Sequence, residues 1–96
     1  MPKSQQQLLE DMNQNVVEFL MADLDSALAF AQRASGLNID PETRRRNLIN
    51  ARKAYDTVTR LREKIRLDSE QQSDFDEKRT NVKNALEQLG ERIGSK

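Results

Sequence analysis

The chain has 96 residues with 16 basic and 16 acidic side chains, so its net charge is zero and its length supports one domain. It contains neither cysteine nor histidine, which excludes disulfides, thiolate chemistry and the commonest general base and transition-metal ligand. Few glycines and prolines leave little material for β-turns, whereas good helix formers dominate the composition. The sequence therefore predicts an all-α protein.

The first expected helix runs from about residue 5 to residue 35. Ser4 followed by Gln7 is typical of a capping box, and Gly36 suits the end of a helix. Asp40 and Pro41 then resemble an N-cap and a first helical position, so the second helix is expected over about 41–66.

The third expected helix covers about 69–93. It follows the capping residues near Asp68 and precedes Gly94. Because short connections between long helices force antiparallel neighbours, the sequence predicts an antiparallel three-helix bundle that forms a single domain over residues 1–96.

Each expected helix carries an apolar face at alternating three- and four-residue steps, as in left-handed bundles. In the second helix the face consists of Leu48, Ala51, Tyr55, Val58 and Ile65, and in the third of Phe75, Val82, Leu86, Leu89 and Ile93. The first helix has two adjacent stripes: Leu9, Val16, Val17, Leu20, Leu24, Ala27, Leu28 and Ala31, and beside them Leu8, Met12, Phe19 and Phe30. Its combined apolar arc is roughly 200° wide.

This wide arc has two interpretations. The first helix is either the central helix of the bundle, buried by both neighbours, or it uses part of the arc to bind a second copy or another helical protein. The second interpretation gives a candidate self-association surface of Leu8, Met12, Val16 and Phe19. The few apolar residues at the start of the third helix favour it, because that helix offers little surface to cover two stripes.

Charge is concentrated in the middle of the chain. Residues 41–67 carry nine basic and three acidic side chains, whereas the segments on either side are net acidic. A candidate basic face of Arg46, Lys53, Arg60 and Lys64 lies opposite the apolar face of the second helix. Such a face could follow a phosphate backbone in a nucleic-acid-associated protein. Alternatively, it fixes the antiparallel register between two acidic helices and is otherwise solvated.

No pattern of catalytic residues is evident. Acidic side chains occur in pairs, such as Asp23 with Asp25, but a small helical bundle rarely provides the desolvated cleft that catalytic carboxylates need. Tyr55 lies in an apolar face and is expected in the core, with its hydroxyl at the rim. Without a glycine-rich phosphate loop or a nucleophile elbow, we expect no enzyme activity, no cofactor and no metal site.

The longest apolar run is far shorter than the ~20 residues that span a bilayer, so no membrane association is expected. The N-terminal residues also lack the apolar core of a signal peptide. The sequence predicts a cytoplasmic protein.

Two local resemblances add to this interpretation. The segment 23–34 resembles the second helix of a tetratricopeptide repeat, with Ala27 and Ala34 at its small positions and Phe30 one place before its bulky position. No second copy follows at ~34 residues. The stretch 50–58, preceded by Asp40 and Pro41, is similar to small bacterial helical-bundle proteins without an assigned activity. That resemblance spans residues 21–93 and implies a similar fold.

These features predict a helical interaction or scaffold module that associates with itself, forming a homo-oligomer, or with another helical protein. Nucleic-acid association through the second helix is the alternative.

Overall fold

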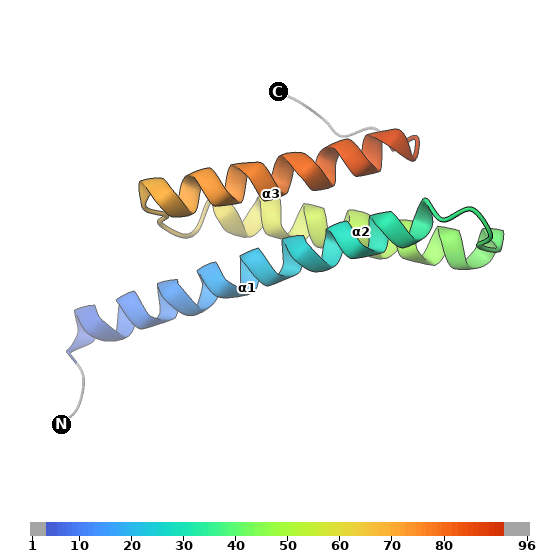
Figure 1. Ribbon diagram of the computed structural model, residues 1–96. Coiled ribbons are helices and arrows are strands. Elements are labelled where there is room, and N and C mark those ends of the chain that lie inside the picture. The colour runs from blue at the N-terminus through green and yellow to red at the C-terminus, as the bar shows by residue number, and fades with distance from the viewer. Residues whose placement is uncertain (1–3, 92–96) are drawn as a thin grey trace.

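The computed structural model describes residues 4–91 and has three α-helices in this range: α1 (Gln5–Ala34), α2 (Pro41–Arg62) and α3 (Ser69–Gln88). Consecutive helices run in opposite directions and pack side by side, which confirms the predicted all-α three-helix bundle (Figure 1). At 30 residues α1 is longer than α2 and α3, at 22 and 20, and its first turns extend past the ends of both (Figure 1).

All three helices begin at side-chain caps. The Ser4 hydroxyl accepts a hydrogen bond from the first turn of α1, and the Asp40 carboxylate accepts one of 2.8 Å from the Thr43 backbone N–H. Asp68 and Gln71 form a reciprocal capping box at the start of α3, with distances of 2.7 and 3.0 Å. These bonds satisfy N–H groups that have no partner within the helix. The helix starts predicted from the sequence are therefore confirmed.

The expected end of α2 at position 66 was wrong, because α2 ends at Arg62. The backbone N–H of Lys64 bonds to the carbonyl of Leu61, and the Arg62 guanidinium donates to the Ile65 carbonyl at 3.1 Å. The chain thus leaves the helix in a tight turn and packs Ile65 and Leu67 against the core.

The expected end of α3 at position 93 was also wrong. Gly90 has a φ of +92°, its N–H bonds to the Glu87 carbonyl, and the Glu91 N–H bonds to the Leu86 carbonyl. This is a Schellman motif, which ends a helix at a residue in the left-handed conformation. Glycine is usual there, because residues with a side chain disfavour that conformation. Gly94, the stop expected from the sequence, lies outside the described residues.

The core lies along the whole α1–α2 interface and continues onto α3. Its buried members are Val17, Leu20, Leu24, Ala27, Ala31 and Ala34 of α1, Ala51, Tyr55 and Val58 of α2, and Phe75, Val82 and Leu86 of α3. Helix α1 packs against both partners more extensively than they pack against each other, so it is the central helix. Burial against α2 and α3 therefore explains one of the two apolar stripes of α1, the one that contains Leu20 and Leu24.

The start of α3, which is poor in apolar residues, is held mainly by Phe75. This ring is buried, and the guanidinium groups of Arg62 and Arg79 lie 5.8 and 5.7 Å from its centre. Arg62 also donates a hydrogen bond to the Gln72 side chain. Cation–π contacts and the apolar stems of the arginines cover Phe75 where aliphatic residues are missing.

The connection between α2 and α3 is joined to α1 by one side chain. The Asn13 amide donates to the Arg66 carbonyl and accepts from the Arg66 N–H, both at 3.0 Å. Nearby, the Gln71 amide donates to Gln14 at 3.3 Å. These contacts mark where α1 enters the bundle, and the turns before Asn13 project beyond it.

Candidate functional site

The first candidate surface is an exposed apolar stripe on α1. Leu8, Met12 and Phe19 are 49%, 62% and 53% exposed, and their spacing places them on one face of the helix. We call these three residues the α1 stripe. Val16, which the sequence placed in the same surface, differs because it is only partly exposed and packs against the core.

Two causes leave the α1 stripe uncovered. Leu8 and Met12 lie before Asn13, where neither α2 nor α3 runs beside α1 (Figure 1). Leu9 was expected in the core stripe but is 58% exposed for the same reason. Phe19 lies within the bundle, but its face of α1 points away from the core. Large apolar groups at helical spacing on a surface are typical of an interaction site.

The second candidate surface is the basic side of α2. Arg46, Lys53 and Arg60 are exposed and recur every seven residues, so the structure places them along one face. We call them the α2 basic face. Lys64, the fourth residue expected there, is exposed but follows the end of α2 in the turn to α3.

A shallow hollow of about 520 Å³ lies over the same side of α2. Its lining residues are Ile49, Arg52, Lys53, Asp56, Thr57, Arg60 and Glu91. Ile49 is 52% exposed, which makes it an apolar residue within a charged surface. Sequence reasoning missed Ile49 because it fits none of the apolar faces. Its position one turn from Arg46 and Lys53 was the available signal.

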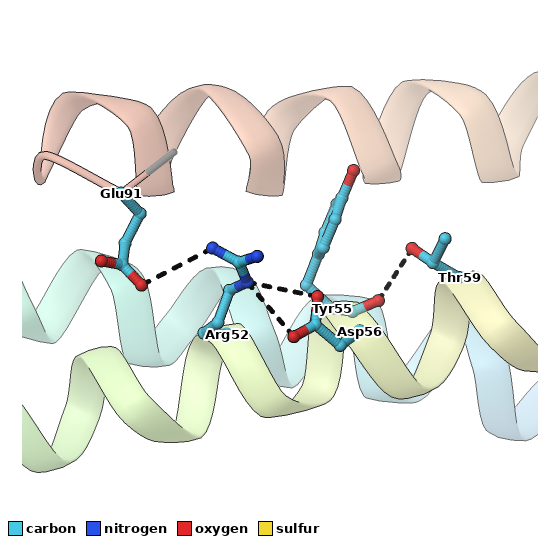
Figure 2. A network of polar contacts seen from close by, with 5 residues as sticks. All are labelled: Arg52, Tyr55, Asp56, Thr59 and Glu91. Atoms are coloured by element: carbon cyan, nitrogen blue, oxygen red, sulfur yellow. Dashed lines mark hydrogen bonds and ion pairs between the residues drawn. The ribbon is translucent and has the colours of Figure 1, made fainter. Parts of the chain in front are cut away.

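Arg52 belongs to the bundle's internal contacts, and not to the free part of the basic side. Its Nε lies 3.2 Å from an Asp56 oxygen, and its Nη1 lies 3.7 Å from a Glu91 oxygen (Figure 2). The first ion pair lies within α2, and the second joins α2 to Glu91, which follows the end of α3. The sequence did not predict the pair with Glu91, because that residue was expected inside α3.

Tyr55 is 7% exposed, and Figure 2 shows its ring crossing from α2 toward α3. This burial confirms that Tyr55 belongs to the core. The Thr59 hydroxyl donates to the Tyr55 carbonyl at 2.9 Å, a bond within α2 that leaves the phenol uninvolved.

A groove of about 380 Å³ lies between α1 and α2, beside the α2 basic face. Its lining residues are Asp23 and Phe30 of α1 and Asn50, Lys53, Ala54 and Thr57 of α2. Burial raises the pKa of the Asp23 carboxyl above its ordinary value, because desolvation disfavours the charged form. Within residues 4–91, no hydrogen bond or ion pair reaches Asp23.

A third contact set holds α3 against α1. The Lys78 ammonium donates to the Asp25 carboxylate at 2.7 Å, and this hydrogen bond raises the pKa of Lys78. In the part of the chain that the structure describes, no cluster of three or more potential metal-ligating side chains occurs. No described helix is long and apolar enough to cross a membrane.

The segment 23–34, with its resemblance to a tetratricopeptide-repeat helix, forms the second half of α1, where Ala27 and Ala34 are buried. The chain matches no protein-family model, and no curated protein or solved structure was found to be similar to it.

Proposed function

We propose that this protein is a cytoplasmic, non-catalytic helical module that self-associates through the α1 stripe. The observation that carries the proposal is the exposure of Leu8, Met12 and Phe19 on one face of α1. Six large hydrophobic side chains are exposed in the described range, and half of them belong to this face. A symmetric dimer covers such a face in both copies at once.

The expected association is reversible. Each stripe residue is about half exposed, so covering it contributes roughly 1 kcal/mol, against about 1.5–3 kcal/mol for burying a fully exposed side chain of this size. A dimer covers these residues in both copies, which doubles the contribution of one copy, but association itself costs several kcal/mol. The stripe alone therefore supports weak binding, and a tighter complex requires further contacts around it.

The test is the molar mass in solution of the wild type and of Met12→Glu with Phe19→Glu. We expect the wild type to be oligomeric at high micromolar concentration and the variant to be a folded monomer with unchanged helical circular dichroism. The matched control is Gln7→Glu with Gln32→Glu, which adds the same charge at exposed positions of α1 outside the stripe. This control should associate like the wild type. A monomeric wild type would refute the proposal.

Nucleic-acid association is the second candidate, and the exposed, seven-residue spacing of Arg46, Lys53 and Arg60 favours it. Phosphate contacts weaken steeply with salt, so a bound duplex should be released as the salt concentration rises. Retention of a short DNA duplex at moderate salt by the wild type, but not by the variant with all three residues changed to glutamate, would support this function.

A further inference from the structure

The charges around the α1 stripe oppose a contact between two copies of α1. Between residues 4 and 32 the chain has five acidic residues and no basic one. Glu18 and Asp23 lie next to Phe19 along this segment. Pairing the α1 stripe with its own copy would therefore bring acidic segments together, and like charges in contact destabilise an interface.

Helix α2 has the opposite charge. It carries seven basic and two acidic residues, and one of the acids, Asp56, is already paired with Arg52. The exposed Ile49 lies between Arg46 and Lys53 on the basic side. This surface therefore combines an apolar contact with positive charge, which complements the apolar and acidic character of the α1 stripe.

One groove lies between α1 and α2 beside the α2 basic face. Asp23 and Phe30, which follow the α1 stripe along the helix, line the groove from α1, and Lys53 of the α2 basic face lines it from α2 together with Thr57. Because α1 and α2 are adjacent and antiparallel (Figure 1), a two-fold axis running between them along the helices places α1 of each copy over α2 of the other. One symmetric dimer then contains the complementary contact twice.

Asp23 provides the second line of evidence. Burial in the groove raises the pKa of this carboxyl, and within the described range no cation neutralises it. Lys53 lines the same groove but makes no ion pair with it. A partly desolvated carboxylate is stabilised by a cation brought from outside, and the basic face of a second copy supplies one.

We infer that the α2 basic face of a second copy of this chain packs over the part of α1 around Phe19 and Asp23, in a reciprocal dimer with α1 of each copy antiparallel to α2 of the other. The axis keeps each residue at its level along the helices, so Phe19 of one copy lies near Arg60 of the other, and Asp23 faces Lys53 and Arg60. The inference rests on the proposed self-association and specifies its interface.

Charge exchange tests the interface. The first variant carries Glu18→Lys with Asp23→Lys, the second carries Lys53→Glu with Arg60→Glu, and the third combines all four changes. Each of the first two variants places like charges opposite each other, so the dissociation constant of its dimer should rise about ten-fold or more. The combined variant has its charges exchanged, and its dimer should recover most of the wild-type affinity.

The control for the second variant is Arg45→Glu with Arg66→Glu, which makes the same charge change at exposed positions outside the α2 basic face. This control should dimerise like the wild type, and every variant should keep its helical circular dichroism. Sedimentation equilibrium at moderate salt measures the dissociation constants. Raising the salt concentration should weaken the wild-type dimer, because the contact is charge-assisted.

The outcomes separate this inference from the proposed function. A wild type that is monomeric refutes both. If Met12→Glu with Phe19→Glu abolishes the dimer but Lys53→Glu with Arg60→Glu leaves it intact, self-association stands and the α1–α2 interface is overturned. The interface is equally overturned if the second variant still dimerises but loses binding to a DNA duplex, because the basic face then serves nucleic acid. Recovery of affinity by the combined variant supports the interface, since a contact between two α1 stripes would not recover.

Discussion

The Asn13 side chain makes two hydrogen bonds to the backbone of Arg66, one to its N–H and one to its carbonyl, each 3.0 Å long. This pair joins the first helix to the connection between the other two across 53 positions of sequence. It fixes the level at which α1 enters the bundle, and so decides which of its apolar residues are covered.

Asn13→Ala should lower the free energy of unfolding by about 1 kcal/mol, because two backbone groups exchange an amide partner for water. Urea unfolding followed by circular dichroism measures the change. Asn15→Ala, at an exposed position of the same helix, is the control and should stay within about 0.5 kcal/mol of the wild type. Equal effects of the two substitutions would contradict the role assigned to the Asn13 side chain.

Substitution of two leucines of α1 should distinguish its buried face from its exposed part. Leu24 is 1% exposed and Leu9 is 58% exposed. Leu24→Ala should cost about 2–5 kcal/mol, since it leaves a cavity between α1 and its partners. Leu9→Ala should cost less than about 1 kcal/mol in the monomer, because Leu9 lies beyond the bundle. Similar losses in thermal unfolding would mean that the face of α1 has been assigned wrongly.

Gly90→Ala should shorten the stable part of α3, because a φ of +92° costs an L-residue roughly 1–2 kcal/mol. Gly90→Asn should be less harmful, since asparagine tolerates the left-handed region better. Thermal unfolding of the two variants, compared at one protein concentration, tests this order. The opposite order would exclude left-handed strain as the cause.

Asp23→Asn should stabilise the monomer at neutral pH. Burial raises the folded-state pKa of Asp23, so the charged form is disfavoured and stability falls as pH rises from about 4 through the folded pKa. Asparagine removes this penalty. The variant should therefore unfold at a higher temperature than the wild type at pH 7, and the two should converge below about pH 4. The comparison is made at low concentration, where no dimer contributes, and a wild type that is more stable at pH 7 would contradict it.

Asp40→Asn should destabilise the protein at neutral pH, which is opposite to the effect expected of Asp23→Asn. The hydrogen bond from the Thr43 backbone N–H, with one from the Thr43 hydroxyl, lowers the pKa of Asp40. A lowered pKa stabilises the fold above about pH 4, and that stabilisation is lost as pH falls through the folded pKa. The wild type should therefore exceed the variant at pH 7, and the difference should shrink in acid. A difference that does not change with pH would assign the effect to the cap's shape instead of its charge.

The helix starts and the core faces could be predicted because they depend on local chemistry. Asp40 before Pro41 defines a cap without reference to the rest of the chain, and the spacing of Val58 or Leu86 defines a face. The helix ends depend on tertiary contacts. Whether Gly90 or Gly94 closes α3 is not decided by composition, and the end of α2 depends on where Ile65 and Leu67 can reach the core.

The candidate surfaces were predicted only in part for the same reason. Spacing on the helix placed Leu8, Met12 and Phe19 together, but it assigned Leu9 to the core because periodicity carries no information about where the neighbouring helices stop. The pair of Arg52 with Glu91 required the Schellman turn at Gly90, and Ile49 could be assigned to a surface only from the hollow that it lines. Interaction surfaces depend on what remains uncovered, which is a property of the assembled bundle.

The projection of α1 beyond Asn13 gives this helix two segments of unequal stability. The buried side chains of α1 lie between Val17 and Ala34, so hydrogen exchange of the backbone amides there should require global unfolding, whereas the turns before Asn13 should exchange through local fraying. A few helical turns that bury no large apolar side chain are marginal in water. The α1 stripe includes residues from both segments, so a partner that binds it must also order the projecting turns. Part of the binding free energy is then spent on conformational entropy, which makes assembly rapidly reversible and sensitive to protein concentration.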